Sequence, residues 1–270
     1  MSQVYAPVSV VIPMYQHIAS LDRAMQSILN QTQVPDECII VSDGGSNNEF
    51  EDLQNLLQKY DANWLKLIRL PENRGAGYAR QIGWNLAKNS LIAFLDADDA
   101  WHPKKIEVQY RLMVDNPDIA LCGHRHRVES ASPNWSSYQI DASFQSIGLF
   151  NCLLRNPFVT PSIMLRTNIS ERFHSAQRHS EDYRLWLEVI ASGHKAIKLN
   201  SELTCVFKPL ISHTGLSSNL WAMEYGELMA YWGACKGHPL MWIAFPGLVI
   251  YSLIKFVRRI LVFLQKYTQR

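Results

Sequence analysis

The first hundred residues alternate between short apolar runs and stretches with helical periodicity, and this alternation constrains the fold more than any other feature. The apolar runs have the length and β-branched content of buried strands, and they cover residues 8–12, 38–41, 67–70 and 91–95. Between them, apolar side chains recur every three or four residues, as in 18–29 and 53–60. Four such alternations predict an α/β fold: a Rossmann-like, doubly wound, mainly parallel sheet.

Acidic residues follow the second and fourth expected strands: Asp43 after the second, and Asp96, Asp98 and Asp99 after the fourth. Unpaired carboxylates are costly to bury, and a hard divalent cation that prefers oxygen ligands would be a suitable partner. The acids therefore indicate a Mg²⁺ or Mn²⁺ site. The alternative is a solvated acidic turn before a helix that starts near Pro103.

Polar and glycine-containing segments follow the first and third expected strands, at Tyr15 and at Asn73-Arg74-Gly75. Ligands of doubly wound sheets bind where the carboxyl ends of the strands open, so these segments should meet the acids at one site. Arg74 and Arg80 offer positive charge for a phosphate, and Gly75 permits close backbone approach. An ordinary turn with surface arginines is the alternative. A dinucleotide fingerprint is excluded, because the first expected strand is followed by Pro13-Met14-Tyr15 without a glycine.

Five short motifs, in this order, resemble those of glycosyltransferase family 2, the inverting enzymes of the GT-A fold. The motifs are Val10-Val11-Ile12-Pro13-Met14-Tyr15, Ser42-Asp43-Gly44-Gly45-Ser46, Asn73-Arg74-Gly75 with Ala79-Arg80, Asp96-Ala97-Asp98-Asp99, and Glu181-Asp182. The resemblance covers about residues 1–220. It implies a GT-A domain with a nucleotide-sugar half at 1–115 and a smaller acceptor-side half at 116–220, followed by a helical tail at 221–270.

The resemblance also implies roles for single residues toward a nucleotide-diphospho-sugar, with a UDP-sugar as the expected donor. Asp43 would bind the base, and Pro13 and Tyr15 would line the base and ribose pocket. The remaining nucleotide-binding residues would be Asn73, Arg74, Gly75, Arg80 and Asp96. Asp98 would ligate Mn²⁺ or Mg²⁺, with Asp96 beside the same ion.

The second half supplies the acceptor chemistry. Glu181 and Asp182 open a stretch with the periodicity of an amphipathic helix, where acids also favour the helix dipole, so simple capping is the alternative. Inverting transfer needs a base that takes the proton of the attacking acceptor hydroxyl. The resemblance places this base at Asp182, with Glu181 as support or acceptor contact. It also implies that His213 contacts the metal or diphosphate, although a histidine in this Ser/Thr/Gly segment could equally be a surface loop residue. Other histidines, including His124, show no metal spacing and are expected on the surface or facing the acceptor.

The C-terminal segment is apolar from Leu240 to Val257, and residues 236–270 contain six Lys or Arg and no acid. Three arrangements remain open: a transmembrane helix, a helix packed on the core, and an interfacial helix. The apolar run is short for a span and is interrupted by Pro246-Gly247. The interfacial helix is favoured, with the basic residues Lys255, Arg258, Arg259 and Lys266 beside anionic lipid.

Composition agrees with a folded enzyme, and the resemblance together with the tail implies a cytoplasmic enzyme on the inner face of a bacterial membrane. The five cysteines are widely spaced without a C-x-x-C pair, which fits a reducing compartment. No secretory signal is recognised at the N-terminus, and no basic patch favours nucleic acid. The sequence therefore predicts a metal-dependent transferase that extends a surface glycan or lipid-linked glycan. The alternatives are a sugar nucleotidyltransferase, which would carry a Gly-rich basic loop after the first strand, and an inactive binding scaffold of the same fold.

Overall fold

The computed structural model describes residues 4–16, 18–61, 63–130, 132–207 and 219–268, with side chains described up to residue 261. The strands are β1 (Tyr5–Met14), β2 (Val34–Ser42), β3 (Leu65–Arg69), β4 (Leu91–Phe94), β5 (Ala100–Trp101), β6 (Ile119–Val128), β7 (Phe144–Ser146), β8 (Met164–Arg166) and β9 (Lys195–Val206). The α-helices are α1 (Ile18–Leu29), α2 (Asn47–Leu57), α3 (Ala76–Leu86), α4 (Lys105–Asp115), α5 (Leu149–Leu154), α6 (Glu181–Ala191), α7 (Leu220–Gly237) and α8 (Met241–Thr268). Two short 3₁₀ helices lie at Trp135–Ser137 and Thr160–Ser162.

The described strands form one nine-stranded sheet in the order β3-β2-β1-β4-β8-β6-β9-β5, with β7 paired to β9. The first four strands of the chain are parallel neighbours. Strand β8 runs antiparallel between β4 and β6, and β6 is parallel to β9. The predicted mainly parallel α/β sheet is confirmed. Because two reversals restore the direction, β6 ends at the same edge of the sheet as β1, β2 and β4.

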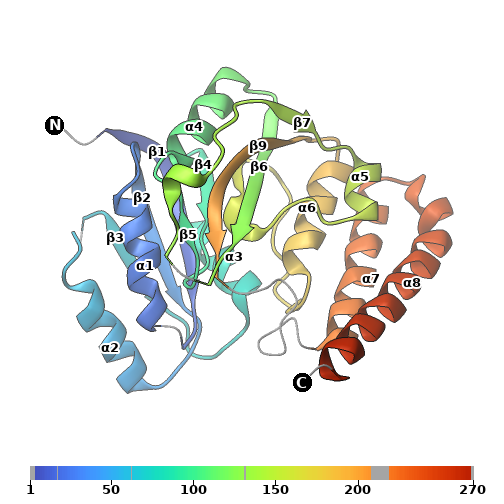
Figure 1. Ribbon diagram of the computed structural model, residues 1–270, viewed down its shortest axis with the longest axis horizontal. Helices are drawn as coiled ribbons and strands as arrows, with labels where there is room; N and C mark the ends of the chain where they lie inside the picture. The colour runs from blue at the N-terminus through green and yellow to red at the C-terminus, as the bar shows by residue number, and fades with distance from the viewer. Residues whose placement is uncertain (1–3, 17, 62, 131, 208–218, 269–270) are drawn as a thin grey trace.

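Two apolar layers cover the faces of the sheet, and the side chains of β1 alternate between them. Val8, Val10 and Ile12 point to one layer, formed with α1, α2 and α4, whereas Val11 points to the other. The second layer contains Trp84 of α3 and the apolar face of α6. Helices α7 and α8 lie outside α6, on the side away from α1 and α2 (Figure 1). The sheet thus runs continuously through both halves of the chain.

Helix α7 packs closely against α6 and the residues just before α6, because two glycines of α7 face them. A Cβ on Gly226 would overlap the His179 carbonyl oxygen, and one on Gly233 would overlap the Glu188 carboxylate. Gln177 ties the same contact together, since its side-chain amide donates to the carbonyls of His179 and Gly226 at 2.9 and 3.1 Å. The position of α7 is therefore fixed relative to the first turn of α6.

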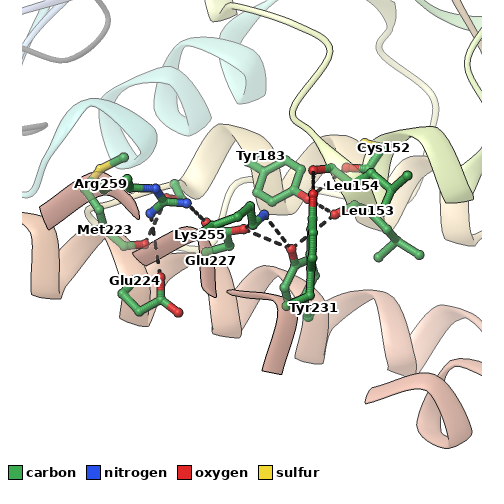
Figure 2. A network of polar contacts seen from close by, with 12 residues as sticks. Cys152, Leu153, Leu154, Tyr183, Met223, Glu224, Glu227, Tyr231, Lys255 and Arg259 are labelled. Carbon is green, nitrogen blue, oxygen red and sulfur yellow. Dashed lines mark hydrogen bonds and ion pairs between the residues drawn. The ribbon is translucent and has the colours of Figure 1, made fainter. Parts of the chain in front are cut away.

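Helix α8 is attached to α7 by buried charges. Glu227 of α7 accepts hydrogen bonds from Lys255 and Arg259 of α8, and Figure 2 shows these side chains meeting between the helices. Burial acts to raise the pKa of Glu227, but Arg259 and Lys255 outweigh it and lower that pKa. The expectation that Lys255 and Arg259 face lipid is wrong, because buried acids of α7 hold both. Arg258 is exposed, and the Lys266 side chain lies outside the description.

The outer face of α8 remains apolar and exposed. Its exposed side chains recur at helical spacing and form what we call the apolar stripe: Ile243, Ile250, Leu253, Ile254, Val257 and Leu261. By length and composition, Met241–Leu261 could cross a membrane, and only 17% of its 18-residue apolar window is buried in the fold. The stripe is therefore not part of the apolar core.

The five cysteines are all buried and none forms a disulfide. Cys38 and Cys122 lie in the apolar layer formed with α1, α2 and α4, Cys152 of α5 and Cys235 of α7 lie in the other layer, and Cys205 lies on β9.

Candidate active site

Asp43 joins the loops that follow β2 and β3. Its carboxylate accepts hydrogen bonds from the backbone amides of Arg74 and Gly75 at 2.8 and 2.7 Å. Gly44 has a φ of +79°, and a Cβ there would overlap the Asn73 backbone, so this close approach needs glycine. Asp43 is buried, at 2% exposure, so the carboxylate is fixed before any ligand arrives.

The other expected nucleotide-binding residues surround this junction. Pro13 is buried at the end of β1, whereas the following Tyr15 is 42% exposed. The Arg74 guanidinium lies 3.8 Å from the centre of the Tyr78 ring and is exposed to solvent. Gly75 caps α3 with a φ of +94°, which turns the chain into the helix. These side chains lie at the edge where β1, β2 and β3 end, as the sequence predicts.

Arg178 is a residue that sequence reasoning missed. It comes from the segment before α6 and donates to both the side-chain and backbone oxygens of Asn73. Its Cγ would lie 3.2 Å from a Cβ on Gly75. No local motif marks Arg178, because its partner is distant in the chain.

Arg80 connects acids from the two halves of the chain. Its guanidinium donates to Asp96 Oδ1 at 2.6 Å and to Glu181 Oε1 at 3.0 Å. Arg80 is only 5% exposed. Burial acts to lower its pKa, but the charges of Asp96 and Glu181 outweigh burial and raise that pKa. The structure therefore places Arg80 as a buried bridge between two acids, and its predicted role near the nucleotide stays a prediction.

Glu181 is the more buried of the two adjacent acids. Burial, and then the charge of Asp182, raise the pKa of Glu181 to about 7, although Arg80 acts in the opposite direction. Gly77 of α3 makes room for this side chain, since a Cβ there would overlap Glu181 Cγ. Glu181 is thus held by α3 through Gly77 and Arg80, in a place that water reaches little.

Asp182 differs from its neighbour because it is partly exposed. Its Oδ2 accepts a hydrogen bond from the Thr160 hydroxyl at 2.8 Å, and its Oδ1 accepts one from the Tyr183 amide at 2.7 Å. The preceding Ser180 has a φ of +53°, a left-handed conformation that is unusual for a non-glycine residue and is common at functional sites. Both acids start α6, so one strained turn positions them together.

Three acids crowd the turn after β4. Asp96 and Asp98 are partly exposed, whereas Asp99 is buried, and burial followed by the charges of Asp96 and Asp98 raises the pKa of Asp99. No group of three or more potential ligand side chains gathers at one point in the described residues. Two carboxylates nevertheless fit Mg²⁺ or Mn²⁺, because these ions are often held by one or two carboxylates together with substrate phosphates. His213 lies outside the described residues.

One histidine prediction fails. His124 is completely buried, and burial followed by the charge of Lys105 lowers its pKa well below the ordinary value, so it is neither a surface nor an acceptor-facing residue. Its strand, β6, is covered on that side by α4, where Lys105 is buried as well.

Comparisons with known proteins agree with this geometry. The model of the family described as Glycosyl transferase family 2 matches residues 9–173. The UDP-Glc:alpha-D-GlcNAc-diphosphoundecaprenol beta-1,3-glucosyltransferase WfgD of Escherichia coli is 26% identical over 83% of this chain and 83% of its own length. The amylovoran biosynthesis glycosyltransferase AmsE of Erwinia amylovora is 27% identical over 71% of this chain and 72% of its own length.

Among solved structures, residues 1–349 of S. aureus TarS in complex with UDP-GlcNAc superpose with a TM-score of 0.68, cover 91% of this chain and share 15% sequence identity. The match covers 71% of the TarS chain. At this identity the likeness concerns the fold, and it agrees with the GT-A architecture expected from the motifs.

Proposed function

The chain belongs to glycosyltransferase family 2, and from this premise we propose that it is a metal-dependent inverting enzyme of cell-surface polysaccharide synthesis. It would move a sugar from a nucleotide-diphospho-sugar, most simply a UDP-sugar, to a hydroxyl of a glycan or lipid-linked glycan. The observation that carries this proposal is the bridge formed by Arg80. The Arg80 guanidinium binds both Asp96, which follows β4, and Glu181, which is the neighbour of the proposed base Asp182.

For the donor, we assign the base and ribose to Asp43, Pro13 and Tyr15, and the loop of Asn73, Arg74 and Gly75 to the nucleotide. Asp43 is preorganised by two amide hydrogen bonds, which leaves its carboxylate oxygens with further acceptor capacity. Tyr15 is exposed beside it and offers an aromatic face. The structural neighbour TarS has been seen with UDP and with UDP-GlcNAc, which supports a uridine nucleotide for this fold.

For the base, Asp182 suits the task better than Glu181. Asp182 is partly exposed and is oriented by Thr160 and by the Tyr183 amide, so it can meet an acceptor hydroxyl. Glu181 is buried and paired with Arg80, so we assign it to positioning the turn. Asp96 and Asp98 would hold Mn²⁺ or Mg²⁺, with His213 as a third expected contact. Such an ion would neutralise charge on the departing diphosphate.

For the membrane, we propose that α8 lies flat in the cytoplasmic interface. Helix α7 is packed on α6, and α8 runs beside α7 and is tied to it by Glu227, so α8 follows the surface of the domain (Figures 1 and 2). The apolar stripe then faces outward. The exposed Arg258 adds a positive charge beside it, which favours an anionic surface.

Thermal unfolding with nucleotides tests the donor assignment. The wild type and Asp98→Ala are heated with UDP or GDP, each with and without Mn²⁺. A ligand at about a hundred times its Kd adds roughly 2.7 kcal/mol, which moves Tm by a few degrees in a chain of this size. We expect a Mn²⁺-dependent shift with UDP that Asp98→Ala loses and that the exposed control Asp118→Ala keeps. No shift with either nucleotide would contradict the proposal and favour an inactive scaffold.

Sedimentation with vesicles tests the membrane assignment. Deleting α8 is a poor test, because it would leave Glu227 buried without its partners. We expect Ile243→Ser with Ile254→Ser to weaken binding to vesicles that contain phosphatidylglycerol. The matched control, Leu86→Ser with Val114→Ser, removes two exposed apolar side chains elsewhere and should bind as the wild type does. Equal binding of all three proteins would exclude the apolar stripe as the contact.

A further inference from the structure

Four basic residues lie on the paired strands β6 and β9 and at the residue that follows α5, and we call them the cationic cluster: Arg125, His126, Arg155 and Lys198. Arg125 and His126 lie in the last part of β6, Lys198 lies on the neighbouring strand β9, and Arg155 follows α5 directly. Burial, then Lys198 and Arg155, lower the pKa of His126. Burial, then Arg155 and Arg125, lower the pKa of Lys198. The geometry agrees with this, because β6 and β9 are neighbouring strands and the Lys198 ammonium donates to the carbonyl of Pro157, two residues after Arg155.

This positive charge is poorly balanced within the fold. Glu202 contacts Arg125 at 3.8 Å, but its shorter ion pair, at 2.7 Å, is with Arg127. Within the described part of the chain, no carboxylate lies within ion-pair distance of Arg155, His126 or Lys198. The Lys198 ammonium instead donates to the Pro157 carbonyl. An anion from outside would relieve the repulsion.

The cluster is connected to the proposed base through a short segment. Pro157, which accepts from Lys198, lies three residues before Thr160, and the Thr160 hydroxyl donates to Asp182. A molecule whose anionic group met the cationic cluster could therefore present a neighbouring hydroxyl toward Asp182.

Apolar surface lies on the other side of the cluster. Helix α5, which ends at Leu154 just before Arg155, exposes Phe150 at 71% and Leu154 at 39%. The Tyr251 hydroxyl of α8 donates to the Leu154 carbonyl at 3.0 Å, so α8 adjoins the end of α5. The Leu153 carbonyl is bound in turn by Tyr231 of α7, as Figure 2 shows. Along the segment from Phe150 to Thr160, exposed apolar side chains thus come first, then Arg155 and the carbonyl that Lys198 binds, and then the hydroxyl that contacts Asp182.

We propose that the cationic cluster binds the diphosphate of a lipid-linked sugar acceptor, with the lipid chain on α5 and α8 and the sugar at Asp182; this rests on the proposed transferase function. The order of the three surfaces matches the order of the three parts of such an acceptor. Two or more basic side chains that converge on a diphosphate provide charge-assisted hydrogen bonds, which are about twice as strong as neutral ones.

Binding of farnesyl diphosphate, measured by calorimetry with UDP and Mn²⁺ present to fill the donor site, tests this inference. We expect Arg155→Gln with Lys198→Gln to weaken binding at least tenfold. The control Arg111→Gln with Lys195→Gln removes the same net charge from exposed positions and should change binding less than twofold. UDP affinity should be equal in all three proteins.

Other outcomes separate the inference from the function on which it rests. The acceptor site would be overturned, with the transferase function intact, if the wild type bound UDP but not farnesyl diphosphate. The same conclusion would follow if Arg155→Gln with Lys198→Gln bound farnesyl diphosphate as tightly as the wild type does. Inorganic pyrophosphate should bind at least tenfold more weakly than farnesyl diphosphate; equal affinity would show a site for free anions and overturn the lipid assignment. Failure of the wild type itself to bind UDP would instead overturn the proposed function.

Discussion

The Arg80 guanidinium donates to Glu181 Oε1 at 3.0 Å and so connects α3, in the first half of the chain, to the first turn of α6, in the second. The two residues are 101 positions apart in the sequence, and both are buried. The first turn of α6, which carries the proposed base Asp182, is therefore positioned by α3, the helix that follows the loop of Asn73, Arg74 and Gly75.

Replacing Arg80 should destabilise the fold. Arg80→Gln leaves Glu181 buried without its cation, and breaking such a pair costs about 3–5 kcal/mol. The loss should be largest above pH 7, where Glu181 is charged in the wild type. Chemical denaturation at pH 8 measures it, with the exposed Arg74→Gln as the control. A loss below about 1 kcal/mol would show that the pair contributes little.

Glu181 should make stability depend on pH. Because its pKa is about 7 in the folded chain against an ordinary 4.5, the folded state holds a proton that the unfolded state releases within this range. Stability from this group is complete below about pH 4.5 and is lost as pH rises to about 7, by up to about 3 kcal/mol. The glutamine of Glu181→Gln does not titrate. The difference in free energy of unfolding between the wild type and this variant, measured with urea at each pH, should therefore follow the same dependence on pH. A flat difference would place the pKa of Glu181 near its ordinary value.

Asp182→Asn should lower kcat by about 10²–10⁴-fold while the UDP-dependent shift in Tm stays unchanged, because a general base acts on the proton and not on the donor. Thr160→Val should cause a smaller fall, and Thr160→Ser should restore activity, since the hydroxyl that orients Asp182 is then kept. Steady-state kinetics with the natural acceptor measures both. Near-normal kcat in Asp182→Asn would move the base elsewhere.

Gly226→Ala should impair transfer although Gly226 lies on α7. The added Cβ would overlap the His179 carbonyl, so α7 or the turn at Ser180 must move. Overpacking of this kind costs about 1–3 kcal/mol, and a small displacement of the base lowers kcat further. Gly247→Ala is the control, because nothing lies within 4 Å of its Cβ and it should stabilise α8 by about 1 kcal/mol. Unchanged Tm and kcat in Gly226→Ala would show that the contact can relax freely.

Much of the fold of residues 1–115 could be predicted from the sequence. The strand and helix periods depend on local residue spacing, so β1 to β4 and helix α1 lie where the apolar pattern places them, whereas α2 begins and ends earlier than the stretch expected at 53–60. The positions of Asp43 and Asp96 followed from the rule that parallel strands end at a common edge.

The contacts between the halves could not be predicted in this way. The approach of Arg178 to Asn73, of Thr160 to Asp182, and of Lys255 to Glu227 depends on tertiary packing that no local pattern encodes. The tail shows this most clearly. A lysine within an apolar run is typical of a membrane surface, and only the position of α7 reveals the acid that neutralises it.

The buried cysteines give this molecule an internal set of chemical reporters. A thiol reagent can modify a buried cysteine only when the packing around that cysteine opens, so the rates of modification measure local opening events. Cys235 would report α7 leaving α6, whereas Cys38 would report opening of the sheet itself. Detachment of α7 could thus be timed on the native chain, without a label or an added residue.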